Sequence, residues 1–248
     1  MHRRAAPPSA ALSLPAVIVL FVTGAGCSAP GAPPSASTPA TASAPTPHAH
    51  GEGHGFHHRF DDAEGWAKVF DDPARDAWQQ PEEVVRALAL APGMTVADLG
   101  AGTGYFVERL ARGVGASGRV FALDVEESMV RHVRERAAKA GLSQVEGKQV
   151  TARDPGLEAR SVDRILVVDT WHHLDDRAEY TRRLARALRP GGFVLVVDYE
   201  PEASMGPPRR HRLPASTVAG ELRAAGLVAE VVDEGLPHQY MVRGKAAP

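Results

Sequence analysis

The sequence predicts an α/β fold with one doubly wound, mostly parallel sheet of seven strands that is covered by helices on both faces. From residue 60 onward, short apolar runs alternate regularly with longer stretches of helical pattern. The apolar runs are nearly continuous, which is typical of strands buried on both faces of a parallel sheet. The segment 60–248 is long enough for a single domain of this kind.

Helices are expected before the first strand. Asp61 and Asp62 can cap a first helix that carries Trp66 and Phe70. The stretch FDDPARDAWQQP (70–81) then reads as a turn followed by a short amphipathic piece. Pro81, followed by two glutamates, is typical of a first helical turn, and it predicts a second helix that continues through residue 91.

Seven apolar runs are the expected strands, and helical patterns separate most of them. The runs are TVADL (95–99), RVFALDV (119–125), VEGKQV (145–150), RILVVD (164–169), FVLVVDY (193–199), LVAEVVD (227–233) and HQYMVRG (238–244). The helical patterns cover 105–112, 127–140, 176–188 and 214–225. Because the short EGLP segment joins the last two runs, we expect them to form an antiparallel pair, so that an antiparallel edge strand completes the sheet.

The chain begins with features of an export signal. A basic start (1–4) precedes the apolar run AALSLPAVIVLFV (10–22), and small residues then lead to Cys27, the single cysteine of the sequence. This pattern resembles a bacterial lipoprotein signal, in which the chain is cut before a cysteine that carries lipid. The alternatives are a plain secretory signal with an incidental cysteine, or a wrongly assigned start. We therefore expect residues 1–27 to be a lipoprotein-type signal peptide with its lipid-attachment cysteine. The protein is then an exported lipoprotein that is anchored to a membrane of a bacterial cell envelope. The protein is cytoplasmic if the start or the signal is wrong.

The segment 28–59 is expected to be a linker. Residues 28–47 contain Pro, Ala, Ser and Thr without a large apolar side chain, so they cannot bury enough surface to offset the entropy of ordering. The next eleven residues, HAHGEGHGFHH (48–58), hold five of the eleven histidines. Imidazole clusters bind metals, but glycines separate these ones, so a solvated linker and a weak metal site both remain open and no metal ligand is assigned. The folded domain is expected over 60–248.

Composition limits the classes of partner. The formal net charge is -2, and basic side chains alternate with acidic ones, so no basic groove indicates nucleic acid. A single cysteine allows neither an internal disulfide nor a cysteine-based zinc site.

The motif VADLGAGTGYF (96–106) carries the strongest chemical signal. An apolar strand that contains Asp98 runs into Gly100, Gly102 and Gly104, where glycines let a ligand approach the main chain closely. The spacing G-x-G-x-G lacks the third glycine of a dinucleotide fingerprint, which argues against NAD. The next expected strand delivers Asp124 at its carboxyl end, where a carboxylate can accept both hydroxyls of a ribose. Together these features indicate a nucleoside site.

The segments DLGAGTGYF, ALDVEESM, VDRILVVDTWHHL and LRPGGFVLVVDY together resemble a class I S-adenosylmethionine-dependent methyltransferase (EC 2.1.1.-), and the N-terminal signal resembles an exported or lipoprotein-like subgroup of these enzymes. The resemblance implies a Rossmann-like seven-stranded sheet and S-adenosyl-L-methionine as the cofactor. It also implies a set of cofactor-binding residues: Asp98, Gly100, Ala101, Gly102, Thr103, Gly104, Asp124, Val125, Asp154 and Asp169. Among these, Asp154 is the carboxylate nearest to the place where relatives contact the adenine amine, and its alternative role is to cap the turn at DPG.

The resemblance also locates the reaction at the end of the fourth strand, in Asp169-Thr170-Trp171-His172-His173. There, His172 or His173 is the candidate general base if the acceptor must lose a proton. The alternative is that one imidazole packs or bonds to the loop, and Trp171 is either an acceptor platform or core. In the stretch 70–81, Arg75 can meet the cofactor carboxylate and Trp78 can close over the cofactor, unless both merely pack on the core.

These features predict methyl transfer to a small-molecule acceptor that is apolar or membrane-associated. Arsenite methylation needs several thiolates, and the DNA amino-methyltransferases use prolines that the fourth strand end lacks. The alternative function is a non-catalytic lipoprotein that keeps the fold and binds a nucleoside or a metal.

Overall fold

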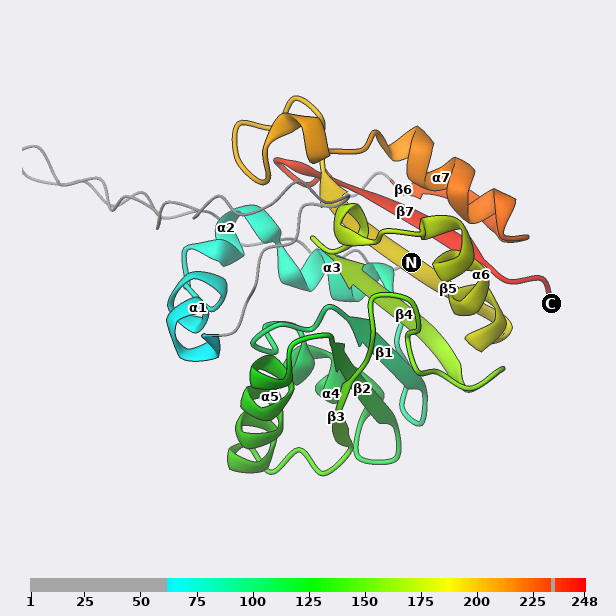
Figure 1. Cartoon of the computed structure of the whole chain (residues 1–248). Coiled ribbons are helices and arrows are strands. Elements are labelled where there is room, and N and C mark those ends of the chain that lie inside the picture. Colours follow the sequence, from blue (N-terminus) through cyan, green and yellow to red (C-terminus); the bar gives the residue numbers. More distant parts are fainter. Residues whose placement is uncertain (1–61, 233–234) are drawn as a thin grey trace, which may run out of the picture. The chain divides into compact units, whose positions relative to one another are not determined.

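The computed structural model describes residues 62–232 and 235–248 (Figure 1). The expected signal, the lipid-attachment cysteine, the linker and its histidine-rich end all lie outside the described residues. Helices α1 (Ala63–Phe70), α2 (Arg75–Gln79) and α3 (Pro81–Ala87) come first. The Asp62 side chain caps α1 by accepting a 3.0 Å hydrogen bond from the Gly65 N–H, as the sequence predicts.

Strands and helices then alternate as expected. The strands are β1 (Thr95–Leu99), β2 (Arg119–Asp124), β3 (Val145–Gln149), β4 (Val162–Val168), β5 (Leu188–Tyr199), β6 (Val228–Val232) and β7 (Gln239–Lys245). The helices are α4 (Val107–Val114), α5 (Glu127–Lys139), α6 (Arg177–Ala187) and α7 (Ala215–Ala224), with the 3₁₀ turns η1 (Trp171–His173) and η2 (Arg209–His211).

The seven strands form one sheet in the order β3-β2-β1-β4-β5-β7-β6. The first five are parallel to one another, and β7 runs antiparallel to both β5 and β6. The predicted antiparallel pair is therefore present at this edge, with β7 inserted beside β5 and β6 outermost. Strand order reverses between β1 and β4, and a sheet of this kind binds its ligands outside the carboxyl ends of the strands at such a point.

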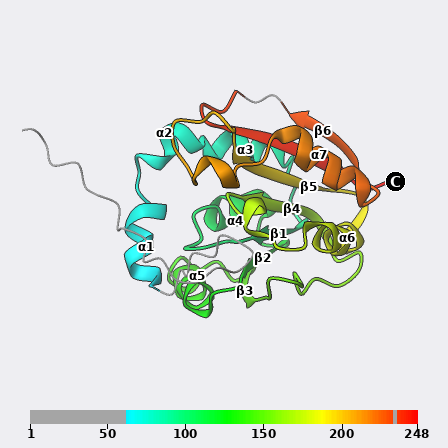
Figure 2. The same ribbon diagram turned by 45° about the horizontal axis from the view of Figure 1, so that its top comes forward.

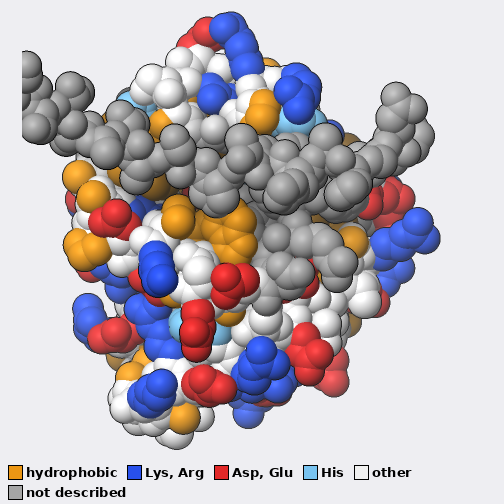
Figure 3. Space-filling view, turned by 60° about the vertical axis from the view of Figure 1, so that its left-hand side comes forward, with side chains coloured by type: hydrophobic (Ala, Val, Ile, Leu, Met, Phe, Trp, Pro, Cys, Tyr) orange, Lys and Arg blue, Asp and Glu red, His pale blue; other side chains and the backbone are white. Residues whose placement is uncertain are grey.

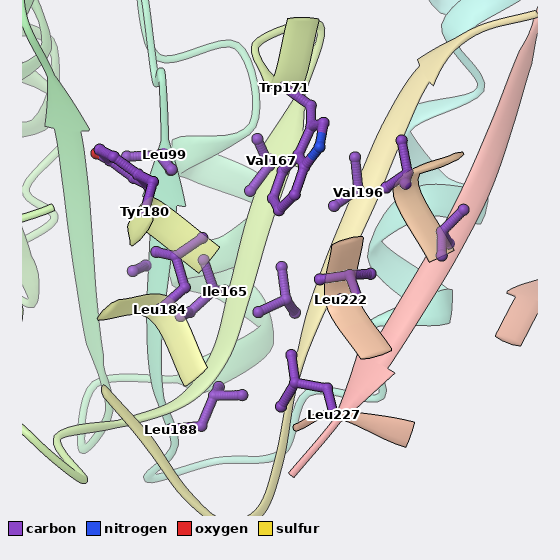
Figure 4. Packing of buried hydrophobic residues seen from close by; sticks show 14 of the residues in the cluster. Leu99, Ile165, Val167, Trp171, Tyr180, Leu184, Leu188, Val196, Leu222 and Leu227 are labelled. Atoms are coloured by element: carbon purple, nitrogen blue, oxygen red, sulfur yellow. The ribbon is translucent and has the colours of Figure 1, made fainter. Parts of the chain in front are cut away.

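Helices cover both faces of the sheet (Figures 1 and 2). On one face, Leu184 of α6 and Leu222 of α7 belong to a buried cluster that includes Ile165 and Val196 of the sheet (Figure 4). On the other face, side chains of α3 and α4 pack with the neighbouring positions of the same strands, for example Leu110. Because side chains alternate across a strand, each strand serves both clusters, which explains its continuous apolar run.

Two element boundaries differ from the expectation by more than two residues. Helix α3 ends at Ala87, short of residue 91, because Ala89 has φ 46° and the chain turns toward Gly93. Strand β5 begins at Leu188 and not at residue 193. The PGG segment (190–192) belongs to the strand, because Gly191 can adopt the φ of 73° that the backbone requires there.

No helix within residues 62–232 and 235–248 is both long enough and apolar enough to cross a membrane. On the face shown in Figure 3, basic and acidic side chains are interspersed.

Candidate active site

A cavity of about 410 Å³ lies at the carboxyl ends of β1, β2 and β4. The loop after β1, the ends of β2 and β4, and helix α2 all contribute to its wall. Its lining includes residues 100–103 of the glycine loop (100–104) and the carboxylates of Asp98, Asp124 and Asp169. The site therefore lies where the strand order reverses, as the sequence predicts.

The glycine loop presents its backbone to the cavity. Gly100, Gly102 and Gly104 have φ values of 76°, 54° and 88°, which non-glycine residues rarely adopt. A Cβ atom on Gly100 would lie 2.2 Å from Oγ1 of Thr170, so the close packing of loop and strand end excludes a side chain there. The N–H groups of Gly100 and Ala101 donate to the carbonyl of Leu123 in β2, and these hydrogen bonds hold the backbone of the loop in place.

Asp124 joins the end of β2 to the glycine loop. One carboxylate oxygen accepts a 2.8 Å hydrogen bond from the Gly102 N–H, and the other accepts a 3.0 Å hydrogen bond from the Glu126 N–H. Burial raises the pKa of Asp124, and the backbone donors oppose that shift. A carboxylate oxygen has room for more than one donor, so both oxygens of this cavity-lining group can still accept from a ligand.

Asp98 and Asp169 are two further carboxyl groups that the cavity wall desolvates. Burial, and then the nearby charge of Asp124, raise the pKa of Asp98 to about 7. Burial also raises the pKa of Asp169 to about 7, against the opposing charge of Arg75. Asp169 has φ 52°, a strained value that turns the chain sharply after β4. Both carboxyl groups therefore have a pKa near 7, and a cation bound in the cavity would favour their ionised forms.

Helix α2 and the turn before it are tied to the glycine loop. Asp71 accepts a 3.0 Å hydrogen bond from the Thr103 hydroxyl and a 2.9 Å hydrogen bond from Arg136. Asp76 pairs with the Tyr105 hydroxyl and, at 3.1 Å, with Arg109. These contacts hold α2 over the cavity.

Helix α2 places Arg75 and Trp78 on the cavity wall. The Arg75 guanidinium lies 4.1 Å from the centre of the Tyr105 ring and 3.6 Å from an Asp169 oxygen. The Trp78 ring lies 6.0 Å from that of Tyr199, at the end of β5, and both rings line the cavity. Arg75 and Trp78 therefore line the cavity, and closure of this segment over a cofactor stays a prediction.

The 3₁₀ turn η1 gives three consecutive side chains different surroundings, although the ring centres of His172 and His173 lie only 4.2 Å apart. A 3₁₀ helix has three residues per turn, so successive side chains point about 120° apart. Trp171 is fully buried between β4 and β5 (Figure 4), and its indole N–H donates to Glu221 of α7 at 2.7 Å. His172 turns to Asp198 of β5 at 2.9 Å, and His173 lines the cavity. Trp171 is therefore a core residue.

Sequence comparison now places the chain. Residues 96–192 match a family model described as a methyltransferase domain. A S-adenosylmethionine-dependent methyltransferase from Aquifex aeolicus has a structure that covers 75% of this chain, with 99% of its own length matched, 31% identity and a TM-score of 0.69. The chain belongs to the S-adenosylmethionine-dependent methyltransferases.

Two further similarities concern part of the chain and the fold. The ubiquinone/menaquinone biosynthesis C-methyltransferase UbiE of Klebsiella pneumoniae is 32% identical over 108 residues. The chain matches 43% of the length of that relative, and 43% of this chain is covered. A structure titled a possible exported protein from Bordetella parapertussis shares the fold, with a TM-score of 0.57, 19% identity, and 73% of this chain and 72% of its own covered.

The cavity of this methyltransferase fits S-adenosyl-L-methionine, the cofactor of the family. The glycine loop contributes backbone without a side chain to the cavity wall at Gly100 and Gly102. Asp124, at the end of β2, has acceptor capacity for the ribose hydroxyls, and Asp98 and Asp169 offer anionic oxygens to the cationic end of the cofactor. Arg75 faces the same wall and can take a carboxylate.

The structure brings most of the predicted cofactor residues of the methyltransferase together. The cavity is lined by Asp98, Gly100, Ala101, Gly102, Thr103, Asp124, Val125 and Asp169. Gly104 closes the loop behind this wall, 3.2 Å from Val133 at its Cβ position. The Thr103 hydroxyl already donates its proton to Asp71, so toward a ligand it can only accept a hydrogen bond.

Two predicted residues take other positions, since Asp154 and His172 lie outside the cavity lining that the described residues form. Asp154 accepts a 2.9 Å hydrogen bond from the Gly156 N–H and pairs with Arg183 at 2.9 Å. This is the turn-capping alternative, and Thr151 occupies the wall in its place. His172 is withdrawn because Asp198 holds its ring.

Tyr199 and Met205 are among the wall residues of the methyltransferase that the sequence did not indicate. Tyr199 stands at the carboxyl end of β5, the same edge as the other site residues, so strand position was the available signal. Met205 belongs to the segment between β5 and η2, which carries no motif. Among the described residues, no group of three or more His, Cys, Asp or Glu side chains can hold a metal ion.

Proposed function

We propose that this methyltransferase acts on a small, largely apolar aromatic acceptor and that His173 takes up the proton that the acceptor releases. The observation that carries the proposal is the arrangement of the cavity wall. Its cofactor side is the glycine loop with three carboxylates, whereas Trp78, Tyr199, Leu174 and Met205 contribute apolar and aromatic surface.

The aromatic pair supports a flat acceptor. Trp78 and Tyr199 approach with ring centres 6.0 Å apart and with planes tilted by 33°. Aromatic walls favour ring-shaped ligands through offset and edge-to-face contacts. UbiE is a C-methyltransferase of ubiquinone and menaquinone biosynthesis, and the similarity to it supports a quinone-like ring compound as the acceptor here.

The residues of the chain then have separate tasks. When bound, S-adenosyl-L-methionine supplies an electrophilic methyl group on a positively charged sulfur. The glycine loop and Asp124 fix the cofactor, and the aromatic pair orients the acceptor, which is the positioning that an in-line displacement needs. His173, on the cavity wall, would take up the proton that the acceptor loses when it is methylated and would pass that proton to water.

Titration calorimetry of the full chain with S-adenosyl-L-methionine tests the cofactor assignment. We expect the wild-type protein to bind and Asp124→Ala to bind at least about 100-fold more weakly, because the variant lacks the ribose acceptor and the partner of the Gly102 N–H. Glu135→Ala, at an exposed carboxylate on α5, is the control. Absence of binding by the wild-type protein would refute the assignment.

Turnover tests the acceptor class. Isotope-labelled cofactor is incubated with cell extract and the full chain, and labelled products are identified by mass spectrometry. A labelled small aromatic compound supports the proposal, whereas label on protein or nucleic acid contradicts it. Cofactor binding without any labelled product favours the non-catalytic alternative.

We further propose that the enzyme is exported and anchored through lipid on Cys27, which rests on the sequence pattern of residues 1–27. Fractionation of cells that express the full chain provides the test. Cys27→Ser is expected to move the protein out of the membrane fraction, and Ser28→Ala is the matched control. An unchanged distribution of Cys27→Ser would contradict the anchor.

A further inference from the structure

Four side chains from three distant parts of the sequence form a closed ring beside the cavity. Arg75 donates to the Gln79 side-chain oxygen from Nε at 3.3 Å and from Nη2 at 2.9 Å. Gln79 Nε2 donates to the Gln239 side-chain oxygen at 2.6 Å, and Gln239 Nε2 donates to Asp169 Oδ1. The other Asp169 oxygen, 3.6 Å from Arg75 Nη2, closes the ring.

The ring has a fixed direction. A guanidinium can only donate hydrogen bonds, and an ionised carboxylate can only accept them. Each of the two amides between them must therefore turn its oxygen toward Arg75 and its NH₂ toward Asp169. The hydrogen-bonding chemistry of the two charged ends thus determines the amide orientation.

Burial makes the ring costly to open. Gln79 is 0% exposed and Gln239 is 3% exposed, although glutamine is mostly a surface residue. An amide left without partners at these positions would bear its full desolvation penalty. The charged members face the cavity and the amides stand behind them, so the amides cannot contact a ligand directly.

The ring connects elements that local structure leaves weakly fixed. Helix α2 has only five residues, and Asp169 has the strained φ of 52° at the end of β4. Gln239, the first residue of β7, is held in the sheet by its pairing with Tyr199 of β5. The ring therefore fastens α2 and the β4 end to a rigid strand.

We propose that Gln79 and Gln239 are positioning residues for methyl transfer, which hold Arg75 and Asp169 at fixed places on the cofactor wall through this buried ring. The proposal rests on the proposed function, since it assigns a task within the same site. Its consequence is that removing either amide weakens cofactor binding without removing any group that touches the cofactor.

The test compares Gln79→Met and Gln239→Met in the full chain, with Gln144→Met as the matched control. Gln144 is a half-buried glutamine that bonds to the Ala111 carbonyl, in a different part of the domain. Calorimetry with S-adenosyl-L-methionine is expected to give a dissociation constant at least about tenfold higher for both ring variants and an unchanged one for the control. A wild-type affinity in both ring variants overturns the proposal.

A pH series distinguishes a ring that positions Asp169 from one that only stabilises the fold. Asp169 faces Arg75 of α2, Asp198 of β5 and His172 of η1, and the Gln239 amide favours its ionised form. Gln239→Glu keeps the shape of the side chain but replaces the donor with a second carboxylate. We expect the pH at which cofactor affinity is half-maximal to move upward in Gln239→Glu and Gln239→Met, and to stay unchanged in the control.

The outcomes distinguish the two proposals. If the wild-type protein does not bind S-adenosyl-L-methionine, the proposed function fails. If it binds and the half-maximal pH is the same in all variants, the ring has only a structural role and this inference is wrong. Because Gln239→Glu preserves side-chain volume, it provides the pH comparison even if a methionine variant does not fold.

Discussion

Nδ1 of His172 lies 2.9 Å from both carboxylate oxygens of Asp198, and the two side chains are 3% and 0% exposed. The contact locks η1 from the side of β5, while Trp171 locks it from the side of α7. With its two neighbours held, the next imidazole, His173, is directed to the cavity wall. Two identical adjacent side chains therefore have different environments.

Substitution of each histidine is expected to affect a different property. His172→Ala leaves the Asp198 carboxylate buried with less compensation and should lower the free energy of unfolding by about 3 kcal/mol. His173→Ala should reduce kcat by about 100-fold or more, because the acceptor proton loses its base, with a small change in stability. Urea denaturation and steady-state kinetics measure the two effects, and His132→Ala on α5 is the control. Equal loss of turnover in both variants at matched stability would contradict this division.

A side chain at Gly100 is expected to disrupt the cofactor loop. Gly100 and Gly141 both have positive φ, 76° and 68°, so alanine at either position carries about 1–2 kcal/mol of backbone strain. Only at Gly100 does the new Cβ meet another side chain, that of Thr170, whereas Gly141 has nothing within 4 Å. Gly100→Ala should therefore cost about 1–3 kcal/mol more than Gly141→Ala and should abolish cofactor binding. Thermal denaturation and calorimetry give both numbers, and equal stability of the two variants would refute the predicted clash.

The sequence was sufficient for those features that rest on local patterns. Continuous apolar runs gave the order of strands and helices, and Asp62 gave the first helix cap, because periodicity and capping act within a few residues. The glycine loop and Asp124 were found for the same reason, since each follows its strand directly. The pairing of the last two strands was also predicted. The insertion of β7 beside β5 was not, because a short connection determines which strands pair but not which one joins the sheet.

Features that depend on tertiary contacts could not be predicted from the sequence. Gln79 and Gln239 are 160 positions apart, and glutamine carries no motif, so nothing local indicated a buried pair. His172 and His173 have the same chemistry, and only the geometry of η1 separates them. Asp154 shows the same limit, because its distance from the cavity depends on how the turn at residues 151–156 folds.

The aromatic pair is expected to act on the acceptor and not on the cofactor. Trp78→Leu removes one of the two rings whose centres lie 6.0 Å apart, while leaving the glycine loop and Asp124 unchanged. The contact between the acceptor and the Trp78 ring is worth about 1 kcal/mol or more, so its loss should raise the KM for the acceptor by about fivefold to tenfold. The dissociation constant of S-adenosyl-L-methionine from calorimetry should change little. A larger effect on the cofactor than on the acceptor would show that Trp78 closes over the cofactor instead.

The carboxyl of Asp98 is expected to make stability and cofactor binding respond to pH in opposite directions. Its pKa is raised from 3.8 to about 7, chiefly by burial, so the folded state binds the proton more tightly than the unfolded chain does. Its contribution to stability is thus fully present below pH 3.8 and is lost as the pH rises through about 7, at up to about 1.4 kcal/mol per pH unit. Asp98→Asn should therefore stabilise the ligand-free protein by about 2 kcal/mol at pH 8 and have little effect at pH 4.

Cofactor binding should show the reverse dependence, because a cation near Asp98 requires the ionised carboxyl. We expect the affinity of the wild-type protein for S-adenosyl-L-methionine to increase between pH 6 and pH 8, and Asp98→Asn to bind more weakly with a flatter pH profile. Chemical denaturation and calorimetry across this range, with exposed Asp72→Asn as the control, measure both effects. The two results are linked physically, since the desolvation that destabilises the empty site is what gives an ionised Asp98 its attraction for the cofactor. A variant that gains stability at pH 8 but keeps the wild-type affinity would contradict this link.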